Sequence, residues 1–209
     1  MIYSNSLVDK LMPLVLDTSV LINLYASTRG VEILDALPNV IMLPQIVTLE
    51  LEHQTSKKNG EHQFVQDLIA AKNVTLSGLR EREYDIFQSL VSGSPSLDDG
   101  EAATIAIAAS RGYLPIIDEK KGRKQAQAHI PDRQLGWSLD LFRHPKATTK
   151  LGPAVSIDAL YFALRDGRMR IDESHCDHVV NIIGVERALD CKSLPGYKAR
   201  RESWQKLAS

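Results

Sequence analysis

The chain of 209 residues has little cysteine and no long apolar segment. Its only cysteines are Cys176 and Cys191, so we expect no disulfide framework and a reducing, cytoplasmic environment. No apolar run approaches the roughly 18 residues that span a membrane. The short run 11–16 contains Pro13 and ends at Asp17, which is not the pattern of a signal peptide. We therefore expect a cytoplasmic protein with no membrane partner.

An excess of charge of one sign is also absent. The formal net charge of −1 neither favours nor excludes a nucleic-acid partner, so attraction to phosphate must come from local patches. The hydrophobic fraction of 44% and the charged fraction of 24% are those of a globular protein. The length allows one domain with an extension, or two small domains.

Short apolar runs alternate with helical patterns over the first two thirds of the chain. The pattern predicts strands at 14–16, 40–43, 74–76 and 114–117. It predicts helices from Pro44 to just before Gly60 and over 62–72, 81–91 and 119–129, and a helix after a capping box of Ser96 and Asp99 that ends at Gly112. Such alternation favours a mostly parallel α/β sandwich.

The pattern changes after Pro145. Two amphipathic helices are predicted over 155–166 and 174–189, and the polar, basic segment 194–209 is expected to fray. We therefore predict a first domain over residues 1–145 and a helical C-terminal extension over 146–209, packed on or beside it.

Four acidic residues are the candidates for chemistry. Asp17 and Asp118 close short apolar runs, and Glu50 and Glu101 lie near the starts of predicted helices. Ligands of open parallel α/β sheets bind at the carboxyl ends of the strands. If the four converge, their oxygens suit Mg²⁺ or Mn²⁺, and a cation would offset the repulsion between carboxylates.

The helix expected after Asp118 carries a basic run that could hold a phosphate backbone beside the metal; its members are Lys120, Lys121, Arg123 and Lys124. Acids at the centre and bases at the rim suit metal-dependent cleavage of phosphodiester bonds. The alternative interpretation of this run is a solvated helix face.

The acids recur in an ordered set of motifs that resembles the PIN domain over residues 13–142. The closest likeness is to predicted nucleases with a Gly-Glu third motif, related to the toxin ribonucleases of VapC type. The motifs are Leu16-Asp17-Thr18-Ser19-Val20-Leu21, Pro44-x-x-Val47-x-x-Glu50, Leu97-Asp98-x-Gly100-Glu101-x-x-x-Ile105-x-x-Ala108 and Ile117-Asp118-Glu119-x-x-x-Arg123-x-x-Ala126.

The resemblance implies a three-layer α/β/α sandwich and Mg²⁺- or Mn²⁺-dependent cleavage of RNA, or of single-stranded or flapped nucleic acid. It places the metal and the catalytic function on Asp17, Glu50, Glu101 and Asp118, with Ser19 assisting. It also allows an antitoxin protein and a homodimer as partners.

The chain departs from the family pattern at three points. Asp98 and Asp99 compete with Glu101 for the third acidic position. Gly122 stands where relatives often have Ala, which weakens that helix. The tail from about Lys146 is longer than in a minimal toxin.

Other interpretations stay open from the sequence. Each acid could be a helix cap or a solvated helix residue. The protein could be a PIN-like nucleic-acid-binding or toxin–antitoxin interaction protein with little or no turnover. A phosphate-handling α/β protein is a third class, but it usually needs two acids close together at the first strand end, and Asp17-Thr18-Ser19 offers one. The sequence does not decide whether the substrate is RNA or DNA, or whether one or two metal ions bind.

Overall fold

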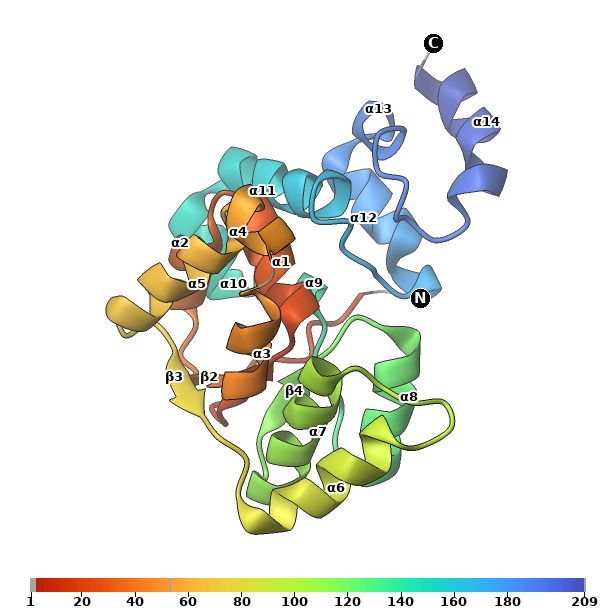
Figure 1. Cartoon of the computed structure of the whole chain (residues 1–209). Helices are drawn as coiled ribbons and strands as arrows, with labels where there is room; N and C mark the ends of the chain where they lie inside the picture. The colour runs from red at the N-terminus through yellow and green to blue at the C-terminus, as the bar shows by residue number, and fades with distance from the viewer. Residues whose placement is uncertain (1–2, 53, 209) are drawn as a thin grey trace. The chain divides into compact units, whose positions relative to one another are not determined.

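The computed structural model describes residues 3–52 and 54–208, which form two compact units (Figure 1). The sheet unit comprises residues 9–22 and 38–137. The helical unit comprises residues 3–8, 23–37 and 138–208. The two units are interleaved along the chain, and the division into domains 1–145 and 146–209 stays a prediction.

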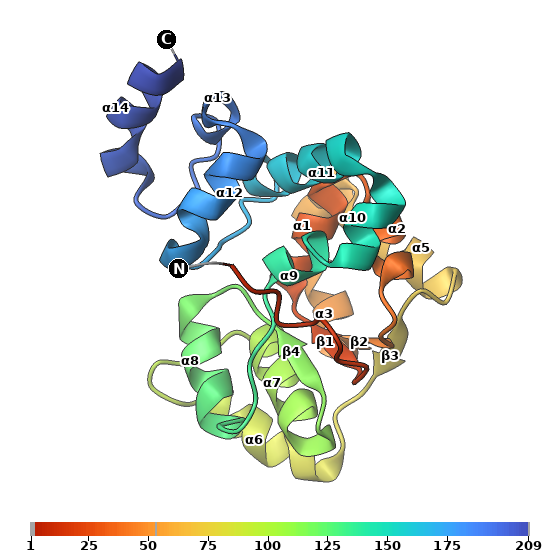
Figure 2. The same cartoon turned by 180° about the vertical axis from the view of Figure 1, so that it is seen from behind.

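The sheet unit is built on a four-stranded, all-parallel sheet in the order β3-β2-β1-β4 (Figure 2). Its strands are β1 (Leu14–Leu16), β2 (Ile41–Pro44), β3 (Thr75–Ser77) and β4 (Leu114–Ile116). Leu14 pairs with Ile41 on one side and Leu114 on the other. All three residues of β1 are fully buried, as expected for a central parallel strand. The predicted α/β class is confirmed, and each strand lies within one residue of its predicted position.

Helix α7 (Asp99–Arg111) packs against β1, β2 and β4, and other helices pack on it in turn (Figure 1). Its small residues, such as Ala102 and Ala106, are fully buried and allow this close approach. The helices that contact α7 are α3 (Gln45–Glu50), α6 (Glu81–Val91) and α8 (Lys120–His129). The remaining helices wholly within this unit are α4 (Gln54–Asn59) and α5 (Glu61–Ala70), which contact each other.

The start of α7 differs from the prediction. Asp98 is the N-cap and accepts a hydrogen bond of 2.8 Å from the backbone N–H of Glu101, so the predicted box of Ser96 and Asp99 is wrong. The register is set by Leu97, which is buried in one core cluster with Leu90 of α6 and donates its N–H to the Leu90 carbonyl. Gly112 ends the helix with φ 73°, as predicted.

The predicted helix between Pro44 and Gly60 is instead two helices. Pro44 ends β2 and precedes α3, and α4 follows separately. His53, which the sequence pattern places on the apolar face of a single helix, lies outside the described residues.

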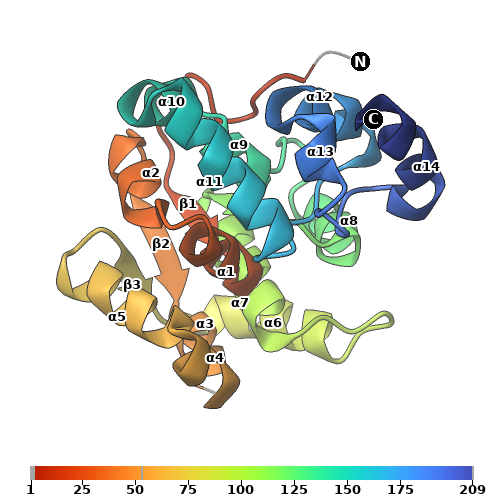
Figure 3. The same cartoon turned by 90° about the horizontal axis from the view of Figure 1, so that it is seen from above.

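The helical unit is all α. Helix α10 packs against α2 and α11, α12 packs against α11, and α13 against α14 (Figure 3). Its elements are α2 (Gly30–Ala36), α9 (Ser138–Phe142), α10 (Pro145–Leu151), α11 (Pro153–Arg165), η1 (Glu173–His175), α12 (Cys176–Ile183), α13 (Val185–Ala188) and α14 (Tyr197–Ala208). Helix α1 (Thr18–Ala26) begins in the sheet unit and continues into this one.

Two expectations for the C-terminal part need correction. The single helix predicted over 174–189 is broken at Gly184, whose φ of 88° is incompatible with a continuing helix. The segment expected to fray contains α14, which buries Trp204 and contacts α13. Across the described part of the chain, no helix combines the length and apolar character needed to cross a membrane.

Candidate functional site

Two of the four candidate acids lie at the carboxyl end of the sheet, where β1 and β4 are neighbours. Asp17 directly follows β1, and Asp118 comes two residues after β4. The chain runs from β1 to β2 on one side and returns to β4 on the other, so this is a topological switch point. Both side chains are buried, Asp17 with 3% and Asp118 with 4% of its surface exposed.

The two carboxylate oxygens of Asp17 differ: Oδ2 accepts hydrogen bonds, and Oδ1 accepts none from the residues that the structure describes. The hydroxyl of Ser19 donates to Oδ2 over 2.7 Å, and the Ser19 backbone N–H donates over 3.3 Å. Oδ1 is buried and has no hydrogen-bond partner among the described residues. Burial raises the pKa of Asp17 to about 7, against the opposing effect of Ser19, and the charge of Asp98 raises it further.

Glu101 lies in the first turn of α7 and faces a similar environment. Its side chain is 3% exposed, and its Oε1 is buried with no partner in the described structure. Burial raises the pKa of Glu101 to about 8, and the charges of Asp17 and Asp98 act in the same direction. These carboxylates therefore repel one another, which is the electrostatic condition that a bound cation relieves.

Glu50, the last residue of α3, connects three elements near this cluster. Its Oε1 accepts a 2.7 Å hydrogen bond from the backbone N–H of Gly100, and its Oε2 accepts one from the hydroxyl of Thr18. The carboxylate thus holds the start of α1 and the start of α7 together. Each oxygen keeps further acceptor capacity.

Two glycines, Gly100 and Gly122, lack the Cβ atom that would collide with the carboxylates of Glu50 and Glu101. A Cβ at Gly100 would lie 2.5 Å from Glu50 Oε2, and a Cβ at Gly122 would lie 2.3 Å from Glu101 Oε1. Gly122 weakens α8 by propensity, as the sequence predicted, but the structure explains why glycine is present there. Sequence patterns carried no signal for this contact, because it joins residues 21 positions apart.

The three acids that compete for the third position differ in environment. Glu101 is buried, whereas Asp98 and Asp99 are exposed. Asp98 is held as the cap of α7, and Asp99 is the first residue of that helix. Burial and the unpartnered oxygen favour Glu101 as the functional acid.

The basic run on α8 divides into two kinds of side chain. Lys120, Lys121 and Lys124 are exposed, and the charge of Lys121 lowers the pKa of Glu101. Arg123 is half-buried: its Nη1 donates to the carbonyls of Ile117 (2.8 Å) and Gly136 (2.6 Å). Its guanidinium also lies 3.5 Å from the ring centre of Trp137. Arg123 therefore stabilises the chain beside β4, and the lysines are the residues directed to solvent.

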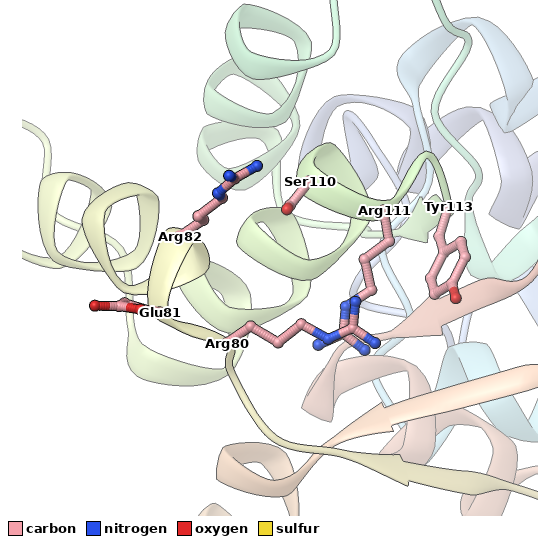
Figure 4. Close-up of a pocket in the computed structure, with 6 residues that line it drawn as sticks. All are labelled: Arg80, Glu81, Arg82, Ser110, Arg111 and Tyr113. Carbon is pink, nitrogen blue, oxygen red and sulfur yellow. The ribbon is translucent and has the colours of Figure 1, made fainter.

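A polar cavity of about 540 Å³ lies in the same unit, at the opposite end of α7 (Figure 4). Arg80 and Arg111 extend toward it, whereas Glu81 points away. Arg111 is occupied by Glu83, to which its Nε and Nη2 each donate over 2.7 Å. Burial acts to raise the pKa of Glu83, but Arg111 outweighs it, so that pKa lies below its ordinary value. This buried ion pair was not predicted, since 28 residues separate its members.

Within the described residues, no three His, Cys, Asp or Glu side chains converge closely enough to hold a metal ion. The observations that fit a metal are the two carboxylate oxygens that find no partner among residues 3–52 and 54–208, and the repulsion between their carboxylate groups. Mg²⁺ is commonly held by only one or two carboxylates, with water and substrate phosphate completing its shell. The donor chemistry of Asp17 and Glu101 therefore fits Mg²⁺ or Mn²⁺.

A family model described as a PIN domain matches residues 13–130, a range that includes all four candidate acids. No curated protein and no solved structure matches the chain significantly.

Proposed function

Because the chain belongs to the PIN-domain family, a family of nucleases, we propose that it is a metal-dependent endonuclease that hydrolyses phosphodiester bonds in RNA. The proposal assigns the metal and the reaction to Asp17, Glu50, Glu101 and Asp118. A relationship to VapC-type toxins, with an antitoxin partner and a homodimer, stays a prediction, as does a cytoplasmic location.

The observation that carries the proposal is a pair of buried carboxylate oxygens, Asp17 Oδ1 and Glu101 Oε1, that have no hydrogen-bond partner in the described part of the chain. An unpaired buried acceptor is costly, and such groups usually have a ligand, water or functional reason. Both carboxyl groups have raised pKa values, which is common at functional sites.

When bound, Mg²⁺ or Mn²⁺ would supply Lewis acidity, lowering the pKa of a water molecule and offsetting charge on the phosphate. The residues of the chain supply the positions. Ser19 orients Asp17, the N-cap Asp98 fixes the first turn of α7 and hence Glu101, and Glu50 ties that turn to α1 through Thr18. The exposed lysines of α8 supply positive charge for a phosphate backbone.

A second candidate is a PIN-like protein that binds nucleic acid or a partner protein with little or no turnover. The features that favour it are the helices that follow the family match and the near-neutral formal net charge of −1. It predicts RNA binding without metal-dependent product.

The test is cleavage of labelled single-stranded RNA with Mn²⁺ or Mg²⁺, beside EDTA and the variants Asp17→Asn and Glu101→Gln. We expect cleavage that requires both metal and Asp17, with each variant reduced at least ~100-fold. Asp85→Asn is the matched control, since Asp85 is an exposed acid of α6 and should retain full activity.

Metal binding has a separate readout. Mn²⁺ should raise the thermal midpoint of the wild-type protein and not that of Asp17→Asn, because a ligand that binds only the folded state stabilises it. Cleavage that is unchanged in Asp17→Asn would refute the assignment. Mn²⁺ binding without cleavage would favour the second candidate.

A further inference from the structure

The cations of this chain are concentrated in the part that follows residue 137. Residues 138–209 contain 12 Lys and Arg against 9 Asp and Glu, whereas residues 1–137 contain 13 against 17. The segment with the acidic site therefore carries net negative charge, which repels a polyanion. Beyond the exposed lysines of α8, further positive charge for a nucleic-acid substrate can come from the rest of the chain.

The helical unit offers such charge in a cavity of about 600 Å³. The cavity, here called the arginine pocket, is lined by Arg165, Arg168, Arg170, Asp190, Lys192 and Ser193. Four of these six side chains are cationic and one is a carboxylate. All four cations are exposed, so the pocket is open to a ligand from solvent.

The internal contacts of the pocket leave part of this charge uncompensated. Arg165 pairs with Asp166 through two hydrogen bonds, of 2.7 and 2.8 Å, and lies over the ring of Tyr161. Asp190 accepts a hydrogen bond of 2.8 Å from the Tyr161 hydroxyl. Arg168 and Lys192 form no ion pair within the residues the structure describes.

The backbone at Arg168 is an independent observation. Arg168 follows Gly167 at the end of α11 and has φ 57°, a left-handed conformation that glycine or asparagine adopts more readily. The chain is held in this turn by the hydrogen bond from Met169 N–H to the Ala163 carbonyl. An arginine in a position where the backbone favours glycine points to a use for its side chain.

We propose that the arginine pocket binds phosphate groups of the RNA strand, with Arg168 and Lys192 as the principal contacts. This inference rests on the proposed function for the choice of RNA as the ligand. Guanidinium and ammonium groups in an open, polar pocket are the usual partners of a phosphate backbone.

The test measures binding rather than cleavage. A fluorescein-labelled single-stranded RNA is titrated in EDTA with wild-type protein, Arg168→Gly and the double variant Arg168→Gln with Lys192→Gln. We expect the dissociation constant of the double variant to rise about tenfold at low salt. The slope of the logarithm of the association constant against the logarithm of the salt concentration should fall in magnitude by about 1.4. This is about 0.7 for each of the two phosphates that the variant no longer neutralises.

Arg168→Gly separates the role of the side chain from folding. Glycine relieves the left-handed backbone, so its thermal midpoint should equal or exceed that of the wild type while RNA affinity falls. The matched control is Lys146→Gln with Lys150→Gln, which removes the same charge from the same unit outside the pocket and should change affinity less than about twofold.

Unchanged affinity and salt slope in the double variant would overturn the inference. An equal decrease of affinity in the control would also overturn it, since it would show an effect of net charge alone. A poly-glutamate peptide is the comparison ligand. If it bound more tightly than RNA, and the double variant weakened that binding, the ligand of the pocket would be an acidic protein and the RNA proposal would be wrong. Because EDTA prevents metal-dependent cleavage, RNA binding through the pocket would stand even if the chain proved to have no nuclease activity.

Discussion

At the scale of residues, the acidic site depends on uncharged donors, two hydroxyl groups and a backbone N–H, that hold its carboxylates. Ser19 occupies one oxygen of Asp17, and Thr18 and Gly100 occupy the oxygens of Glu50. These contacts orient the carboxylates so that Asp17 Oδ1 remains without a partner among the described residues. Orientation of ligands by neighbouring groups typically changes metal affinity by roughly 10- to 100-fold.

The contact of Gly122 with Glu101 gives the first prediction. In Gly122→Ala the added methyl group would lie 2.3 Å from Glu101 Oε1, so the carboxylate must move. We expect Mn²⁺ affinity to fall roughly 10- to 100-fold, measured by calorimetric titration, although alanine is the better helix former by about 1 kcal/mol. Gln125→Ala on the same helix is the control, and equal affinity in the two variants would contradict the prediction.

At the scale of elements, α6, β3 and α7 are joined through the buried pair of Glu83 and Arg111. Beyond its two bonds to Glu83, Arg111 donates to the hydroxyl of Ser77 over 2.5 Å and to the carbonyl of Gly78 over 2.9 Å. Glu83 has no exposed surface, so its charge depends on this partner.

Arg111→Met should therefore lower the free energy of unfolding by about 3–5 kcal/mol, because the buried Glu83 carboxylate would lose its cationic partner and keep the hydrogen bond from the Arg80 N–H. The double variant Glu83→Leu with Arg111→Met should recover most of that stability, since both charges are removed together. Urea denaturation measures both, and Arg82→Met, at an exposed position of α6, is the control. A double variant no more stable than the single one would refute this account.

The cap of α10 gives a prediction about pH. His144 is buried, and its Nδ1 accepts a hydrogen bond of 3.2 Å from the backbone N–H of Lys146, which requires an unprotonated ring nitrogen. Burial lowers the pKa of His144 below 6.5, and the charge of Lys146 acts in the same direction while Asp140 opposes it.

The unfolded chain therefore binds the proton more tightly than the folded one. The stability that His144 contributes is present above pH 6.5 and is lost as the pH falls through the lowered pKa. His144→Asn keeps a capping side chain without titration, so its thermal midpoint should fall less than that of the wild type between about pH 7 and about pH 5. Parallel pH profiles of the two proteins would contradict the role of His144.

At the scale of the whole molecule, the distribution of charge sets the balance between binding and repulsion of RNA. The acidic site belongs to a segment with more acids than bases, and the excess of bases follows residue 137. In the absence of a divalent cation, the carboxylates oppose the approach of a phosphate backbone.

Asp17→Asn should therefore bind RNA more tightly than the wild type in EDTA at about pH 8.5, by about threefold at low salt, with the difference shrinking at high salt. Fluorescence anisotropy measures the affinity, and Asp85→Asn removes the same charge from an exposed position on α6 as the control. Weaker binding by Asp17→Asn than by this control would show that RNA does not approach the acidic site.

The strands, their alternation with helices and the order of the acidic motifs follow from the sequence alone. Apolar runs such as Leu14–Leu16 and an acid placed directly after them are local features, so they can be recognised without a fold. The family match over residues 13–130 agrees with this prediction.

How the acids are held, and which of them are buried, depends on the tertiary structure. Glu50 accepts a hydrogen bond from the backbone N–H of Gly100, 50 positions along the chain. Glu101, and not Asp99, is buried because the packing of Leu97 sets the start of α7. Arg123, whose contact with phosphate stays a prediction, donates to two backbone carbonyls that the sequence did not identify. Contacts of this kind depend on distances between elements far apart in the chain, and no local periodicity encodes them.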